Sequence, residues 1–199
     1  MRESMDKRVM TSEEYDGHCP MGAAGPREMA TCLLSEEQHT LVDLDRVCRI
    51  ALMVTPHPGD DVIDQAWESI STIRAVMKQQ RVPMTVTMQT VFVRSTDDIF
   101  AIRRLMEAYY DHQMPTTSFI VQPPCEGQAL AIEAWALGGE DVEVDFCGPN
   151  VVTVQYDGLR WIYINGIAAP ADRIGAYSET QYAFEQLADR LERVGATFN

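Results

Sequence analysis

The sequence predicts an α+β fold, in which two helices pack on one face of a mixed sheet. Three observations lead to this prediction. Apolar strands and amphipathic helices follow one another from residue 46 onward, turn residues separate them, and hydrophobic residues make up 46% of the 199 residues. A chain of this length and composition suffices for one large domain with its own core, or for one domain plus part of another.

The elements from residue 46 follow the order strand, helix, strand, helix, strand, strand. Residues 46–55 are β-branched or large and apolar, which is typical of a strand. Asp60 and Asp61 then stand where helix N-caps stand, and apolar residues recur at spacings of three and four over 62–80. A strand is expected over 84–94 and a second helix over 99–112.

Two apolar runs, 118–121 and 128–137, complete this unit, and we expect them to pair as an antiparallel hairpin around a turn over 123–127. The second run contains one carboxylate, Glu133, between Ile132 and Ala134. A charge in an apolar strand is costly unless it has a partner or a function. Glu133 is therefore a candidate site residue, and the alternative is an edge-strand glutamate that faces solvent.

The pattern restarts after residue 139. Strands are expected over 150–156 and 159–166, and a helix over 180–194, in which residues 181–185 (QYAFE) echo residues 65–68 (QAWE) of the first helix. We interpret this as an internal repeat. A strand, strand, helix unit cannot close its own core, so a fragment, a cleaved precursor or a partner chain is the expected explanation.

The repeat divides the chain into three parts. Residues 1–27 are polar and rich in turn residues, which indicates an N-terminal arm. Residues 28–145 are the expected first copy, beginning with short strands over 28–34 and 39–44. Residues 146–199 are the expected N-terminal half of a second copy.

Composition excludes several classes of protein. The chain carries 16 Lys and Arg against 30 Asp and Glu, a net charge of −14, which argues against binding nucleic acid. No apolar run approaches the ~20 residues that span a bilayer, and no secretory signal is present, so no membrane contact is expected. Five cysteines without a CxxC motif indicate reduced thiols and a cytoplasmic protein. His18, Cys19, Cys32 and His39 match no common zinc spacing, so no metal or other cofactor is expected.

Several short motifs resemble the RidA/YjgF family of reactive-intermediate deaminases. In the first copy they are residues 87–93, AYY at 108–110, PTTS at 115–118 and AIEAWA at 131–136. In the second copy they are DGLRWIYINGI at 157–167, GAYSETQ at 175–181 and LERVGA at 191–196. The resemblance covers roughly residues 46–199, and the order and spacing of the motifs make it specific.

The resemblance implies a subunit like chorismate mutase of the bacterial trimer type, with ligand clefts between neighbouring subunits of a trimer or pseudo-trimer. In deaminating members an arginine grips the substrate carboxylate, and the glutamate of the I-E-A motif positions a water that attacks an imine or enamine. This implies a catalytic role for Glu133 and substrate contacts for Thr117, Ser118 and Tyr177. Arg173, just before the GAYS segment, is a further candidate cation.

Each of these residues also has a structural alternative. Thr117 and Ser118 could satisfy backbone groups at a turn end, and Tyr177 could pack with its hydroxyl in water. Arg94 and Cys125 are additional candidate site residues. The structural alternatives are that Arg94 is a solvated surface arginine and that Cys125 is an unreactive thiol.

One position departs from the family pattern, because Thr117 stands where the family has its arginine. A threonine cannot make the charged bidentate pair with a carboxylate. Two classes of function therefore remain. One is an enzyme that hydrolyses a small carboxylate-bearing imine, or acts on a chorismate-like ring. The other is a non-catalytic ligand-binding or oligomerisation module. The family's older label, endoribonuclease, is disfavoured by the net charge.

Overall fold

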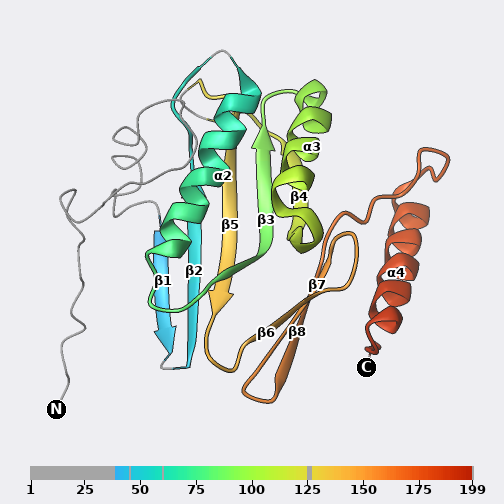
Figure 1. Ribbon diagram of the computed structural model, residues 1–199. Helices are drawn as coiled ribbons and strands as arrows, with labels where there is room; N and C mark the ends of the chain where they lie inside the picture. Colours follow the sequence, from blue (N-terminus) through green and yellow to red (C-terminus); the bar gives the residue numbers. More distant parts are fainter. Residues whose placement is uncertain (1–38, 45, 60, 125–126, 199) are drawn as a thin grey trace.

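The computed structural model describes residues 39–44, 46–59, 61–124 and 127–198. A five-stranded sheet in the order β1-β2-β5-β3-β4 forms its centre (Figure 1). The strands are β1 (His39–Leu44), β2 (Val47–Val54), β3 (Thr85–Val93), β4 (Thr116–Val121) and β5 (Leu130–Gly138). Helices α2 (Val62–Lys78) and α3 (Ile99–Tyr110) cover one face of it. The sheet is mixed, because β3 and β4 are parallel and the other pairs antiparallel. The predicted α+β fold is confirmed.

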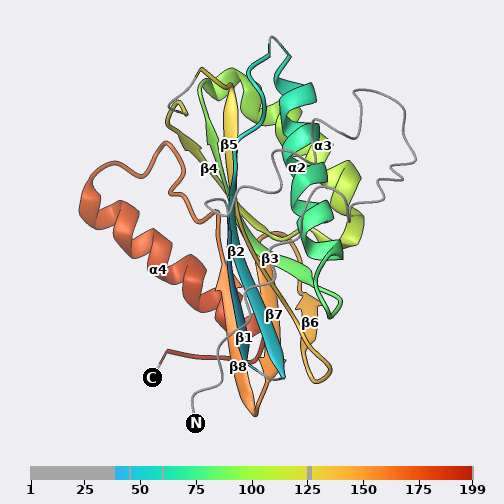
Figure 2. The same cartoon turned by 90° about the vertical axis from the view of Figure 1, so that its left-hand side faces the viewer.

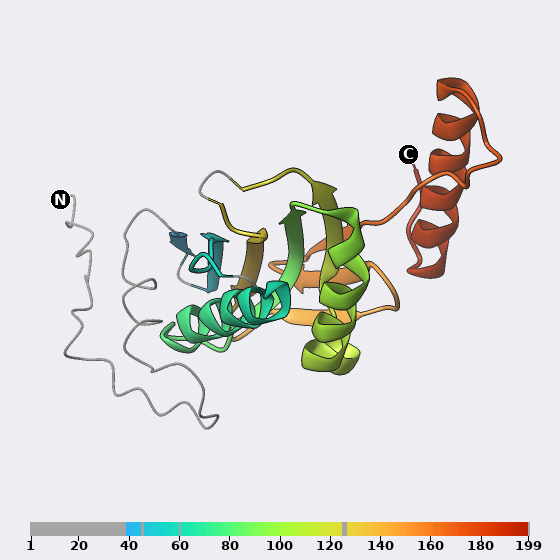
Figure 3. The same ribbon diagram turned by 90° about the horizontal axis from the view of Figure 1, so that it is seen from above.

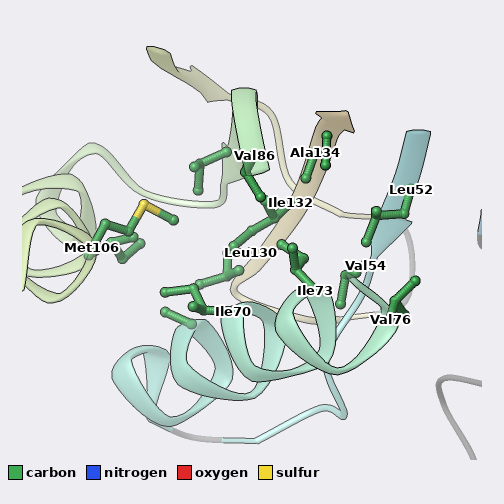
Figure 4. Packing of buried hydrophobic residues seen from close by; sticks show 14 of the residues in the cluster. Leu52, Val54, Ile70, Ile73, Val76, Val86, Met106, Leu130, Ile132 and Ala134 are labelled. Atoms are coloured by element: carbon green, nitrogen blue, oxygen red, sulfur yellow. The ribbon is translucent and has the colours of Figure 1, made fainter. Parts of the chain in front are cut away.

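Helix α2 forms where the sequence places it. The Asp61 carboxylate accepts hydrogen bonds from the backbone N–H groups of Ile63, at 2.7 Å, and Asp64, which satisfies donors that the first turn leaves free. The apolar side of the helix, including Ile70 and Ile73, is buried against the sheet (Figure 4). Burying a side chain of this size stabilises the fold by about 1.5–3 kcal/mol.

Strand β5 lies between β2 and β3, so the predicted hairpin of the last two strands is wrong. Helix α3 connects β3 to β4, which places β4 parallel to β3 and beside it. The chain then crosses β3, and β5 fills the centre of the sheet, where its apolar side chains are covered best. At its end Gly138 is required, because a Cβ there would lie 1.9 Å from the Pro83 carbonyl oxygen.

A second sheet, in the order β6-β7-β8, follows β5 and packs against one end of the face opposite α2 and α3. Its strands are β6 (Glu143–Phe146), β7 (Val151–Tyr156) and β8 (Leu159–Ile164). Val152 and Val154 of β7 contact Val47 of β2 and Leu137 of β5. Strand β6 was not predicted from the sequence, where acidic residues alternate with apolar ones over only four positions.

Helix α4 (Ala176–Arg193) starts four residues earlier than predicted and buries none of its residues. Figure 2 shows α4 on the side of the main sheet opposite α2 and α3, and Figure 3 shows it standing away from both sheets. The order of hairpin and helix matches that of β1, β2 and α2. The division into copies stays a prediction, and β6 spans its proposed boundary at residues 145 and 146.

Two expectations fall outside the described residues, namely the N-terminal arm and the strand over 28–34. In the described part of the chain, no helix is long and apolar enough to cross a membrane.

Candidate functional site

The face of the main sheet opposite α2 and α3 is only partly covered, and we call its uncovered part the open face. Strand register aligns one row of residues across it: Met53 of β2, Glu133 of β5, Thr90 of β3 and Ser118 of β4. Side chains alternate between faces along a strand. Since Ile132 and Ala134 point into the helix-covered core, Glu133 points to the open face.

Glu133 is half-buried and lies in an apolar setting. The indole Nε1–H of Trp135 donates to its carboxylate Oε1 at 3.2 Å. Large apolar side chains of the open face stay accessible, with exposed fractions of 41% for Met53, 42% for Ile120 and 44% for Trp135. Cross-strand neighbours stand about 5 Å apart, so Thr90 is the hydroxyl residue next to Glu133, Met53 is its neighbour on the other side, and Ser118 lies one strand beyond Thr90. This arrangement can orient a water or a polar ligand.

Thr117, by contrast, points to the helix-covered side. It is 5% exposed, its Oγ1 accepts a hydrogen bond from Gln89 Nε2 at 2.9 Å, and it donates to the Pro115 carbonyl oxygen at 2.9 Å. The Tyr110 hydroxyl of α3 donates to Gln89 Oε1 at 3.2 Å and completes this buried network. The structure therefore brings Ser118, but not Thr117, to the face of Glu133.

Tyr177 and Arg173 belong to the second unit, apart from Glu133. Tyr177, on α4, is 84% exposed. The Arg173 guanidinium carbon lies 5.6 Å from the centre of the Tyr182 ring. Arg173 and Glu179 line an open cavity of about 570 Å³ between the loop before α4 and the first half of that helix. Their roles as substrate contacts stay predictions.

Arg94 has a structural role in the connection between β4 and β5. Its Nη2 donates to the carbonyl oxygens of Gly127 and of Gln128, the latter at 2.7 Å. Together with Gln65, which accepts from the Ala129 N–H at 2.8 Å, it holds the start of β5 in place. Cys125, and the possible zinc ligands His18, Cys19 and Cys32, lie outside the described residues.

One charged group of the open face escaped the sequence analysis. Arg49 of β2 pairs with Leu137 of β5 and lies at the end of the face where the second sheet begins. Its guanidinium carbon is 5.2 Å from the centre of the Tyr156 ring and 5.3 Å from that of the Trp161 ring. These two rings are stacked, with centres 6.4 Å apart and planes at 3°. The sequence does contain a signal for Arg49, because it is the one charged residue within the apolar stretch VCRIALMV.

Two polar atoms of this cluster are buried without a hydrogen-bond partner, Arg49 Nε and the Tyr156 hydroxyl. Buried polar groups are paired in most proteins, so each unpaired one requires an explanation. As for metals, the described residues contain no group of three or more His, Cys, Asp or Glu side chains that could hold an ion.

No protein-family model matches the chain, and no curated protein matches it. Solved structures do match over about half of the chain. TdcF from E. coli, solved with bound serine, is 22% identical over 51% of this chain and 86% of its own, with a TM-score of 0.39. The YjgF gene product from E. coli is 20% identical over 50% and 85%, with a TM-score of 0.38.

A YjgF-family member from Mycobacterium tuberculosis is 17% identical over 49% of this chain and 98% of its own, with a TM-score of 0.40. The second and third of these structures carry the YjgF name of the family that the sequence motifs resemble. The likeness is one of fold.

Proposed function

We propose that the open face is a small-molecule site at which a small carboxylate-bearing imine is hydrolysed, with Glu133 orienting the attacking water. One observation carries this proposal, the half-buried Glu133 carboxylate at the centre of an uncovered sheet face. An ionisable group in a partly apolar setting is a typical feature of catalytic sites. The resemblance of residues 131–136 to the I-E-A motif supports the same role.

In this reaction the Glu133 carboxylate accepts a proton as the water oxygen bonds to the imine carbon. The resulting carbinolamine breaks its C–N bond, and the nitrogen leaves as ammonia with the proton that Glu133 returns. The imine reacts as its N-protonated iminium ion, and the ammonia takes up the proton that the carbinolamine hydroxyl releases. One iminium ion and one water thus give one 2-oxo acid and one ammonium ion, without a cofactor. A positioned general base of this kind contributes roughly 10²–10⁴-fold to a rate.

A second subunit is the proposed cover of the open face. The exposed Met53, Ile120 and Trp135 surround Glu133, and an apolar surface of this kind favours association. The resemblance implies a homo-oligomer, a trimer or pseudo-trimer, in which the ligand lies between neighbouring subunits. The odd number of cysteines, with no CxxC motif, supports a cytoplasmic location.

The test is a coupled assay of 2-iminopropionate hydrolysis. We expect the wild-type chain to accelerate the reaction over buffer, and Glu133→Gln to lose about 10²-fold or more, because the amide cannot accept the proton. Glu143→Gln on β6 is the matched control, since that carboxylate is exposed and lies in the second sheet. A folded wild-type chain with no acceleration over buffer would exclude the deaminase function.

The second candidate function is a non-catalytic ligand-binding or oligomerisation module. The buried position of Thr117 favours it, because no cation replaces the family arginine in the row of Glu133. This candidate predicts an oligomer with no turnover of 2-iminopropionate. Incubation with chorismate, followed by chromatography of the products, tests the related chorismate-hydrolysing alternative.

A further inference from the structure

We infer that Arg49 is the cation of a carboxylate-binding site, in which Tyr156 and Trp161 hold the guanidinium at the end of the open face. The site lies at the junction of the two sheets, with Arg49 on β2 and the two aromatic residues on β7 and β8. None of the motifs of the sequence includes Arg49.

The Arg49 side chain has no counter-ion among the described residues. No hydrogen bond or ion pair joins its guanidinium to another described residue, and its Nε is buried without an acceptor. The chain offers 30 carboxylates to 16 Lys and Arg side chains, so pairing would be easy to achieve. A partly buried arginine is costly unless paired. An anionic ligand explains why this one has no partner in the chain.

Two aromatic rings support the guanidinium of Arg49. The faces of Tyr156 and Trp161 attract the cation, but they accept none of its N–H groups. Tyr156 is only 8% exposed, and its hydroxyl also lacks a partner. Guanidinium and hydroxyl are both hydrogen-bond donors, and an oxyanion accepts from both.

The shape and charge of the guanidinium indicate which class of anion it would bind. The guanidinium is a planar fork that matches the two oxygens of a carboxylate. It is the one cation in contact with these two rings among the described residues, so the site balances a single negative charge. A phosphate dianion would remain under-neutralised there. The site therefore fits a monocarboxylate.

The placement of Arg49 connects this site to Glu133, a step that rests on the proposed function. Arg49, Ala51 and Met53 alternate onto the same face of β2, and Met53 pairs with Glu133. A strand rises about 3.3 Å per residue, so the backbones of Arg49 and Met53 are about 13 Å apart. Both charged side chains are long, and Ala51 between them is small. A carboxylate held by Arg49 would direct the rest of a small ligand toward Glu133.

The test is direct binding, measured through the tryptophan fluorescence of the full chain. We expect 2-oxobutyrate to bind and its uncharged counterpart 2-butanone not to bind. Arg49→Met should weaken 2-oxobutyrate at least 10-fold, and Arg49→Lys should weaken it less, because it keeps the charge but not the fork. Arg160→Met on β8 is the matched control, an exposed arginine that should leave binding unchanged.

Tyr156→Phe keeps the aromatic ring and removes only the hydroxyl, so it tests the site if Arg49→Met fails to fold. We expect it to weaken 2-oxobutyrate several-fold. Unchanged binding in a folded Arg49→Met or Tyr156→Phe variant overturns the inference, as does equal binding of 2-butanone. If inorganic phosphate binds more tightly than 2-oxobutyrate, the assignment of the site to a carboxylate is wrong.

Measuring both the binding of 2-oxobutyrate and the hydrolysis of 2-iminopropionate distinguishes this inference from the proposed function. Arg49-dependent binding of 2-oxobutyrate without hydrolysis of 2-iminopropionate supports the site and excludes the deaminase. Hydrolysis that Arg49→Met leaves unchanged supports the deaminase and excludes the role of Arg49.

Discussion

The two faces of the main sheet are built from the same strands, but they differ in almost every property. On β5, Leu130, Ile132 and Ala134 are fully buried beneath α2 and α3. The alternating residues Glu133 and Trp135 lie on the open face, half-buried and exposed. Around Glu133, hydrophobic burial therefore depends on the helix-covered face, and the open face is free to carry polar chemistry.

The comparison also explains why neighbouring residues of the PTTS motif differ. Thr117 and Ser118 are adjacent in sequence and on opposite faces in the structure. Thr117 belongs to the buried network of Gln89 and Tyr110, whereas Ser118 lies in the row of Glu133. A substitution of Thr117 should therefore affect the helix-covered face, and a substitution of Ser118 should affect the open face.

The largest effect is expected for Thr117→Arg, which restores the family arginine. Position 117 is buried, so an arginine there loses solvent without gaining a carboxylate partner. We expect a loss of about 3–5 kcal/mol in the free energy of unfolding. Denaturant unfolding of the purified variant measures it.

Thr117→Val is the matched control for this change. It keeps the shape of the side chain and leaves Gln89 Nε2 with only the weak acceptor Met106 Sδ, at 3.5 Å, which costs about 1–3 kcal/mol. If Thr117→Arg were as stable as the wild type and hydrolysed 2-iminopropionate faster, the assignment of Thr117 to the covered face would be wrong.

An intermediate effect is expected for truncating isoleucines, with one variant for each face. Ile132→Ala leaves a cavity beneath the helices and should cost about 2–5 kcal/mol. Ile120→Ala, at a position 42% exposed on the open face, should cost less than about 1 kcal/mol. Urea unfolding at equal protein concentration compares them, and equal losses would contradict the difference between the faces.

The smallest effect is expected for the pH dependence of the free energy of unfolding, which arises from Tyr110 on the helix-covered face. Burial, and secondarily the neighbouring Tyr109, raises the pKa of the Tyr110 hydroxyl. The unfolded chain ionises this phenol above pH ~10 while the folded chain keeps its proton. Stability is therefore fully present below pH ~10 and falls above it, by at most about 1.4 kcal/mol per pH unit. Tyr110→Phe should remove this part of the alkaline slope, measured as the unfolding midpoint between pH 9 and 11.

Much of the fold follows from local pattern. The spacing of apolar residues located α2 and α3, and the single charge in the apolar run 128–137 singled out Glu133. The neighbours of each strand do not follow from local pattern. Nothing within 118–137 shows that β3 separates β4 from β5, since that depends on how α3 crosses the sheet.

The candidate site was predictable only where chemistry and motif coincide. Glu133 is a charge in an apolar strand and lies in a recognisable motif. Arg49 satisfies only the first condition, and its aromatic partners come from β7 and β8, about 110 residues further along the chain. The face of Thr117 depended on the register of β4, which the motif does not contain.

The central position of β5 has a consequence for how the protein folds during synthesis. β2 and β3 are not neighbours, and β5, which joins them, is the last strand of the main sheet to be made. Until residues 130–138 leave the ribosome, two half-sheets expose their inner edges to solvent and to other chains. Such long-range pairing slows folding. The nascent chain is thus expected to need protection from aggregation until a single late strand closes the sheet.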